Sequence, residues 1–276
     1  MAVTPKSNVS RRRLLIVVSV ILAVVILVSV LFVYRSLVAD NSDDGLIRVK
    51  SASELRDAIN NAPAGVHVDI AFTADISLGP ELTIPAGADV TLTSDSKTGF
   101  FSLVGWDGQS VIHVTNGAKL TLDGIIVTHE AGATGSGIAV GGILVMVDGK
   151  ITGNSYPEGL GGVYVYTGGV FELVGGVISD NLAERGAGVY VDSGTFKMSG
   201  GEISANTAIG PGWNNGGGGV GMWKGYFEMT GGVITNNTAQ RYGGGVYNMY
   251  GTIDRLGGEI YGNTAGEGND IHELTE

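Results

Sequence analysis

The sequence alternates between short apolar stretches and polar or glycine-rich turns over most of its length. Three such stretches follow one another at 188–191, 195–198 and 202–205. Within each stretch, apolar side chains occupy every second position, which is the spacing of a strand with one buried face. None of them has the spacing of a helix. The pattern therefore predicts three short strands in a unit of about 25 residues.

This unit is repeated along the second half of the chain. Its signature is Gly-Gly, Val or Glu, Ile, two variable residues, Asn, one variable residue and Ala, found at 175–183, 200–208, 231–239 and 257–265, with a weaker copy at 148–154. The asparagines are spaced by 27, 25, 31 and 26 residues. Short strands joined by glycine corners at this period predict an all-β, parallel β-helix solenoid, in which strands of successive coils lie about 4.8 Å apart. A right-handed coil is expected by analogy with known solenoids.

Equivalent positions in successive units form rows that predict which side chains are buried. The expected inward rows are Val163, Val189, Val220 and Val246; Phe171, Phe196, Phe227 and Ile253; Leu173, Met198 and Met229; and Ile178, Ile203, Ile234 and Ile260. Arg255 takes the next place in the third row, so we expect the last coil to be open or shifted there. The repeated asparagines are expected to form a ladder at a corner or, alternatively, a ligand site.

Two further rows are expected to point outward. One consists of Glu172, Lys197, Glu228 and Asp254, and its first three members alternate in charge, which favours the register of the strands. The other consists of Tyr164, Tyr190, Gly221 and Tyr247, with Trp223 close by. Stacked tyrosines either stabilise a sheet or present their ring faces to a ligand, and the sequence leaves both open.

Residues 45–134 repeat less regularly. Ser51 and Glu54 have the spacing of a capping box before a short helix with Leu55, Ala58 and Ile59 on one side, which we expect to cover an open end of the solenoid. Strands are predicted at 66–72, 82–84, 90–93, 111–114 and 120–128. Together with the regular repeats, these strands give a solenoid of about nine coils.

The N-terminus departs from this pattern. Residues 14–33 are apolar apart from two serines, and four basic residues precede them, which predicts a transmembrane signal-anchor helix with its N-terminus in the cytoplasm. A cleaved signal peptide is the alternative, although the apolar core of such peptides is normally shorter. The expected organisation is a cytoplasmic basic segment (1–13), the membrane helix (14–34), a linker (35–46), an extracellular β-helix domain (47–270, with regular repeats at 141–265) and a C-terminal tail (271–276).

Composition narrows the range of functions. The chain has no cysteine, which excludes disulfides, thiol nucleophiles and thiolate metal sites, and its four histidines lack the spacing of metal ligands, so we expect no cofactor. Residues 40–276 hold 11 basic and 27 acidic side chains, a charge of −16 that repels nucleic acid and anionic polymers. Of the 47 glycines, 37 lie in residues 135–276, where the corners of the coils are expected.

The repeat signature, together with Gly-Gly-Gly-Val-Tyr at 243–247, resembles the repeats of bacterial surface proteins of the pectin-lyase-like β-helix superfamily. It also resembles the short repeats of adhesin-like, polymorphic outer-membrane and autotransporter passenger proteins. Residues 49–128 resemble the first coils of the same group. The resemblance extends over about residues 47–270. It implies a right-handed parallel β-helix at the cell surface with one of two functions.

The first function is that of a non-catalytic adhesin or envelope scaffold that binds a glycan or a protein. Its expected contacts are the rings of Tyr164, Tyr190, Tyr247 and Trp223, and Trp213 in the insertion 209–219 of the longest repeat. This insertion is alternatively a disordered linker. The second function is that of a polysaccharide lyase or glycoside hydrolase. A hydrolase needs carboxylates at a defined separation, and the outward rows offer only Glu172, Glu228 and Asp254, so the first function is preferred.

Overall fold

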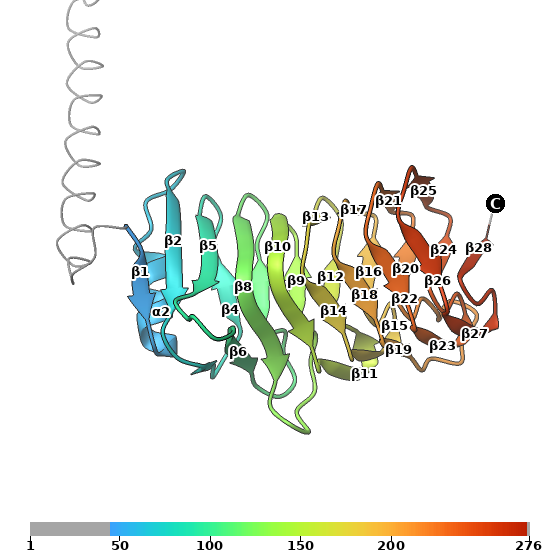
Figure 1. Ribbon diagram of the computed structural model, residues 1–276, viewed down its shortest axis with the longest axis horizontal. Coiled ribbons are helices and arrows are strands. Elements are labelled where there is room, and N and C mark those ends of the chain that lie inside the picture. The colour runs from blue at the N-terminus through green and yellow to red at the C-terminus, as the bar shows by residue number, and fades with distance from the viewer. Residues whose placement is uncertain (1–44, 275–276) are drawn as a thin grey trace, which may run out of the picture. The chain divides into compact units, whose positions relative to one another are not determined.

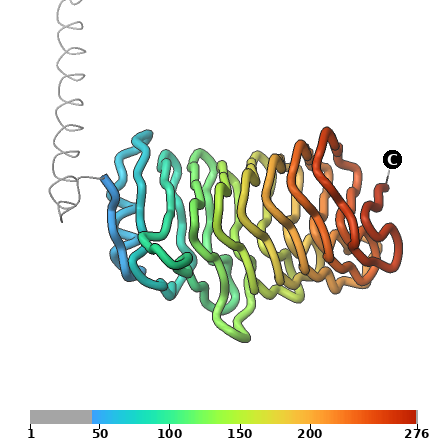
Figure 2. Tube along the Cα trace, in the orientation of Figure 1, coloured from blue at the N-terminus to red at the C-terminus, as the bar shows by residue number. Residues whose placement is uncertain are grey.

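Residues 45–274 are described by a computed structural model, in which the chain winds through a parallel β-solenoid of about nine coils (Figure 1). The trace in Figure 2 shows the coils stacked side by side, from the first strands in blue to the last in red. All strands in residues 45–274 pair in parallel and build three sheets, one on each side of the coil. The repeat period therefore predicted the architecture correctly.

The largest sheet, sheet 1, has 15 strands. They are β1 (Ile47–Val49), β2 (His67–Phe72), β3 (Ile76–Ser77), β5 (Asp89–Ser94), β6 (Phe101–Gly105), β8 (Lys119–His129), β10 (Ile143–Thr152), β13 (Val170–Leu173), β14 (Val177–Ser179), β17 (Thr195–Met198), β18 (Glu202–Ser204), β21 (Tyr226–Met229), β22 (Val233–Thr235), β25 (Thr252–Arg255) and β26 (Glu259–Tyr261). Sheet 1 therefore runs through every coil and covers more of its perimeter than either other sheet.

The other two sheets complete the coil. Sheet 2 contains β4 (Leu82–Ile84), β7 (Ile112–Val114), β9 (Ile138–Val140), β12 (Val163–Val165), β16 (Val189–Asp192), β20 (Val220–Trp223), β24 (Val246–Met249) and β28 (Ile271–Leu274). Sheet 3 contains β11 (Ser155–Leu160), β15 (Leu182–Arg185), β19 (Thr207–Ala208), β23 (Thr238–Tyr242) and β27 (Thr264–Glu267).

The division of the coil into strands differs from the prediction. The three expected strands of one unit are β16, β17 and β18, but β17 and β18 are successive parts of the same sheet. They are separated at Gly200 and Gly201, where the φ of Gly201 is +74°, a left-handed conformation that favours glycine. The third side of the coil is sheet 3, formed by residues that follow the repeated asparagine. These segments are short and pack small side chains such as Ala183 and Ala208 inward, so no apolar alternation marked them.

The inward rows are buried as predicted, except at Ile253 in the last coil, which is only half-buried. Every member of the valine row is fully buried, and so are the three phenylalanines. The ring centroids of Phe171 and Phe196 lie 5.1 Å apart, and those of Phe196 and Phe227 lie 4.8 Å apart, all nearly parallel. In the last coil Arg255 keeps its register with Met229 and is exposed. The last coil is therefore open rather than shifted, and the cost of burying a lone arginine does not arise.

The asparagine ladder is also confirmed. Its five members are Asn154, Asn181, Asn206, Asn237 and Asn263, all buried. The Nδ2 of each of the first four donates to the Oδ1 of the next at 2.9–3.0 Å. At one end His129 Nδ1 lies 2.8 Å from Asn154 Oδ1, and at the other Asp270 Oδ1 accepts from Asn263 Nδ2 at 3.0 Å. Because every amide is used within the ladder, it is a structural feature rather than a ligand site.

A short helix covers the first coil, as the sequence predicts. Helix α2 (Ala52–Asn60) follows Ser51, whose side chain accepts from the backbone N–H of Glu54, and Glu54 accepts from the N–H of Lys50 at 2.9 Å. Leu55, Ala58 and Ile59 are buried. Figure 1 shows the helix beside β1 and β2, at the start of the solenoid. The helix shields the apolar surface of the first coil, which in the middle of the solenoid would be buried by a neighbouring coil.

The two ends of the chain were predicted to be a membrane anchor and a C-terminal tail. The predicted cytoplasmic segment and membrane helix, and the linker up to residue 44, lie outside the described residues. Within residues 45–274, no helix has the length and apolar character needed to cross a bilayer. At the C-terminus, residues 271–274 are not a tail as expected. They form β28, which pairs with β24 from Ile271 to Leu274 and extends the solenoid beyond residue 270.

Candidate functional site

Four of the five aromatic residues singled out from the sequence, Tyr164, Tyr190, Tyr247 and Trp223, belong to the outer face of sheet 2, and Trp213 lies in the insertion 209–219. The predicted row is confirmed in register, because Tyr164 pairs with Tyr190, Tyr190 with Gly221, and Gly221 with Tyr247. The row continues in both directions, through Ala139 to His113 on one side and to His272 on the other. The strand period thus places one aromatic or imidazole ring on most coils of this face.

Two of these tyrosines are covered, and the expectation that the whole row faces solvent is wrong for them. Tyr190 is 5% exposed, and the guanidinium carbon of Arg185 lies 5.5 Å from its ring centroid. Tyr247 is 0% exposed, with the ring of Tyr242 stacked 5.3 Å away. Burial raises the pKa of each phenol to about 12. Both rings stabilise the sheet and offer no free face to a ligand.

The insertion 209–219 is part of this cover. The Tyr247 hydroxyl donates to the backbone oxygen of Trp213 at 2.7 Å, and Asn215 Nδ2 donates to Glu184 Oε1 at 3.0 Å. The insertion therefore packs on the solenoid and is not the disordered linker considered as an alternative. The Trp213 side chain itself is 57% exposed, so it remains accessible beside the covered tyrosine.

The accessible part of this surface, which we call the aromatic face, consists of Tyr164, Tyr166, Trp223 and Tyr250. All four side chains are half-buried. The rings of Tyr164 and Tyr166 lie 5.6 Å apart, and Trp223 and Tyr250 meet edge to face at 5.5 Å. Burial, reinforced by the negative charge of Asp192, raises the pKa of Tyr164. The face therefore combines neutral phenols with partly free ring surface.

One end of the aromatic face is held by a polar chain that sequence reasoning missed. The Tyr166 hydroxyl lies 2.8 Å from His113 Nε2, and His113 Nδ1 lies 3.5 Å from Glu81 Oε1. Burial and the charge of Glu81 raise the pKa of Tyr166. The Tyr166 side chain crosses the backbone of Gly141. A Cβ at Gly141 would lie 2.1 Å from the hydroxyl oxygen of Tyr166. The sequence held one indication of these contacts: His113 takes a place in the tyrosine row, two strands from Tyr164.

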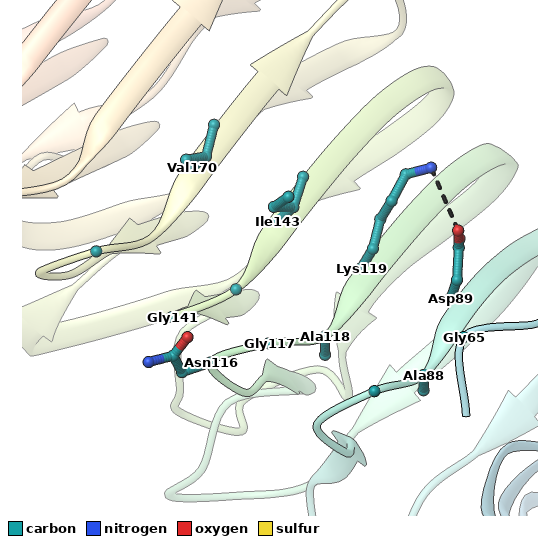
Figure 3. A pocket seen from close by; sticks show the side chains of 13 residues that line it. Gly65, Ala88, Asp89, Asn116, Gly117, Ala118, Lys119, Gly141, Ile143 and Val170 are labelled. Atoms are coloured by element: carbon teal, nitrogen blue, oxygen red, sulfur yellow. Dashed lines mark ion pairs between the residues drawn. The ribbon is translucent and has the colours of Figure 1, made fainter.

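A groove lies beside this face, at the corner where the chain passes from sheet 2 to sheet 1 (Figure 3). Its volume is about 540 Å³. The corners before β8 and β13 have four residues each (115–118 and 166–169), whereas the corner between them has only Gly141 and Gly142. A short corner between two longer ones leaves a notch. Sequence reasoning missed it because the regular signature begins only after this coil.

The walls of the groove are chemically mixed. Asp89, Lys119, Ile143 and Val170 begin consecutive strands of sheet 1 and share one outward row. Lys119 Nζ lies 3.5 Å from Asp89 Oδ2, the ion pair drawn in Figure 3. His67 Nδ1 lies 2.9 Å from Asp89 Oδ1, and this hydrogen bond raises the pKa of His67. Ile143 is 41% exposed and Val170 is half-buried, which gives the other end of the row an apolar surface.

The charged outward row further along sheet 1 is in register as predicted. Lys197 Nζ lies 3.5 Å from Glu172 Oε1. The Tyr226 hydroxyl donates to Asp254 at 2.7 Å and to Glu228 at 3.1 Å, and the bond to Asp254 is the main reason that its pKa is raised. The contacts of Lys197 with Glu172 and of Tyr226 with Asp254 join side chains of adjacent coils, as expected for register control, whereas Glu228 lies on the same strand as Tyr226. Within residues 45–274, no three His, Asp or Glu side chains are close enough to hold a metal ion.

Comparison with known protein families, characterised proteins and solved structures finds no match to this chain. The pectin-lyase-like and adhesin-like resemblance therefore rests on the repeat signature, while the parallel solenoid is seen directly. The accessible rings and the corner groove both offer surface to a ligand.

Proposed function

We propose that the chain is a membrane-anchored, extracellular surface protein whose solenoid is a non-catalytic binding module for a glycan or a surface protein. The proposal includes the finer assignment to right-handed β-helices of the adhesin-like, pectin-lyase-like kind. The observation that supports it best is the aromatic face. Tyr164 in β12, Tyr166 directly after it and Trp223 in β20, two strands further along the same sheet, present partly free ring surfaces.

Rings on a solenoid suit recognition by stacking. Flat aromatic surfaces pack on the apolar faces of sugar rings and on side chains of protein partners, while nearby polar groups fix orientation. Here the strands hold each ring, and the contact of Tyr166 with His113 restrains it further. Little side-chain freedom remains to be lost on binding, which favours affinity from a small contact area.

The anchor is proposed from the sequence alone. The apolar run at 14–33 has the length of a membrane-spanning helix, and the basic residues before it favour a cytoplasmic N-terminus. Intact cells that express the chain with a C-terminal epitope test this arrangement. Surface labelling of the epitope, with the protein retained in the membrane fraction, supports it. An epitope that is accessible only after lysis, or a protein released into the medium, contradicts it.

The binding function is tested with the full-length chain in a detergent that has no sugar headgroup. Arrays of glycans and of envelope proteins are probed with this chain and with the triple variant Tyr164→Ala, Tyr166→Ala and Trp223→Ala. We expect the triple variant to lose the binding that the unchanged chain shows. Tyr261→Ala is the control, because Tyr261 is 52% exposed on the other side of the coil, in β26 of sheet 1.

Two outcomes would overturn the proposal. The triple variant could bind as well as the unchanged chain, which would remove the aromatic face from recognition. Alternatively, the full-length chain could depolymerise a polysaccharide and lose this activity in Glu172→Gln or Glu228→Gln. The protein would then be better assigned as a polysaccharide-active enzyme.

A further inference from the structure

We propose that the corner groove binds a neutral oligosaccharide that lies along the solenoid axis. The groove adjoins the aromatic face at Tyr166, which crosses Gly141, but none of the four aromatic residues lines it. The inference goes beyond the proposed function by adding a second site and naming its ligand class. It begins from the shape of the groove. The lining residues come from the corners before β2, β5, β8, β10 and β13, so the groove crosses five adjacent strands.

The dimensions favour an extended ligand. Strands of a sheet are about 4.8 Å apart, so five strands give a track of about 19 Å along the axis. Six of the residues that line this track are glycines, so much of its floor is backbone. At Gly142 a Cβ would lie 2.3 Å from the carbonyl oxygen of Ala118 and 2.4 Å from that of Thr115, so only glycine lets the coils pack closely there. A ligand can therefore approach the backbone closely.

The walls offer the two kinds of contact that a sugar ring requires. Ile143 and Val170 form an apolar surface for the C–H face of a ring. Asp89, Lys119 and the exposed amide of Asn116 offer donors and acceptors for hydroxyl groups. Figure 3 shows Asn116 on the corner next to Gly141, and Lys119 and Asp89 on the neighbouring strands. A mixed surface of this kind is typical of small-ligand and glycan sites.

The charges favour an uncharged ligand. The Asp89 carboxylate is shared between Lys119 and His67, so the groove already balances its own charges. Residues 40–276 carry a net charge of −16, which repels an anionic polymer before it reaches the groove. An uncharged ligand with hydroxyl groups needs no charged partner in the groove and is not repelled by the net charge.

A peptide is less well suited to this groove than a sugar. A peptide that binds to a sheet as an extended strand does so by pairing with free backbone groups at an edge of the sheet. At this corner the backbone groups already pair between coils: Gly87 N–H donates to Gly117 O, Ile143 N–H to Ala118 O, and Val170 N–H to Gly142 O. These bonds take up the backbone positions that a peptide strand would need.

The test uses the full-length chain in a detergent that has no sugar headgroup. Binding is measured by titration calorimetry against defined neutral oligosaccharides built from glucose, mannose and N-acetylglucosamine. A galacturonate oligomer and an extended peptide of the same length are the competing ligands. Hydrogen exchange then shows which segments are protected on binding. We expect a neutral oligosaccharide to bind and to protect 115–119 and 141–143.

Two variants locate the site. Ile143→Glu places a carboxylate on the apolar wall at an exposed position, and we expect it to weaken binding by about tenfold or more. Asn116→Ala removes an exposed amide and should weaken binding with no effect on folding. Thr252→Glu is the matched control, because Thr252 lies in the same outward row, in the last coil and outside the groove. It should bind as the unchanged chain does.

Each remaining outcome overturns this inference. It is wrong if no neutral oligosaccharide binds, if only the galacturonate oligomer or the peptide binds, or if Ile143→Glu and Asn116→Ala bind normally. The test also distinguishes a failure of this inference from a failure of the proposed function. Trp223→Ala changes the aromatic face at a residue outside the groove, so it should leave groove binding intact. Loss of binding in Trp223→Ala alone would assign the sugar to the aromatic face instead.

Discussion

The side-chain amide of Asn206 donates to Oδ1 of Asn237 in the next coil at 2.9 Å, and its own Oδ1 accepts from Asn181 at the same distance. The same Nδ2 also donates to the backbone oxygens of Ile178 and Ser204. Each buried amide in the middle of the ladder therefore joins three coils. Removal of one amide breaks bonds on both sides of it.

We predict that Asn206→Ala lowers the stability of the solenoid strongly. The substitution removes the acceptor of the buried backbone N–H of Asn181 and the donor to the backbone oxygens of Ile178 and Ser204, at a cost of about 1–3 kcal/mol for each unpaired group. We expect a loss of about 2–4 kcal/mol in the free energy of unfolding, measured by urea denaturation. Asn116→Ala makes the same chemical change at an exposed corner and should have little effect. Equal denaturation midpoints for the two variants would contradict a structural role for the ladder.

The phenylalanine stack should be the most sensitive apolar feature of the core. Phe196 lies between Phe171 and Phe227, with centroids 5.1 Å and 4.8 Å away, and is fully buried. Phe196→Ala leaves a cavity between two coils and should cost about 3–5 kcal/mol, whereas Phe196→Leu fills most of the space and should cost less. Thermal melts of the two variants measure the difference. Similar melting temperatures would show that the neighbouring rings close the gap.

The sequence predicts inward features well because they follow from the repeat period alone. The period places Val163 over Val189 and Asn181 over Asn206, and each coil then repeats the environment of the last. The outward surface depends on differences between coils. Tyr247 is covered because one repeat has an insertion that includes Trp213, and the groove exists because one corner is two residues shorter than its neighbours. Such differences interrupt the pattern, so their consequences require coordinates.

Alkaline unfolding should depend on Tyr190. Burial is the main reason that the pKa of its phenol is raised to about 12, from an ordinary value near 10. The folded chain therefore holds this proton more tightly than the unfolded chain does. The resulting stabilisation is present below pH 10 and is lost as the pH rises from about 10 through 12. In urea titrations over this range, Tyr190→Phe should lose stability less steeply than the unchanged chain. Parallel pH profiles would contradict the coupling.

The hydroxyl of Tyr247 should hold the insertion 209–219 against the solenoid. It donates to the backbone oxygen of Trp213 at 2.7 Å, while the ring itself stays buried under Tyr242. Tyr247→Phe keeps the ring and removes only this bond, so the global stability should fall by about 1 kcal/mol. The insertion should then open more often and be cleaved faster in limited proteolysis, with the cut sites mapped by mass spectrometry. Tyr261→Phe removes the hydroxyl of an exposed ring and is the control. If both variants are cleaved at the same rate, the insertion is held by other contacts, such as that of Asn215 with Glu184.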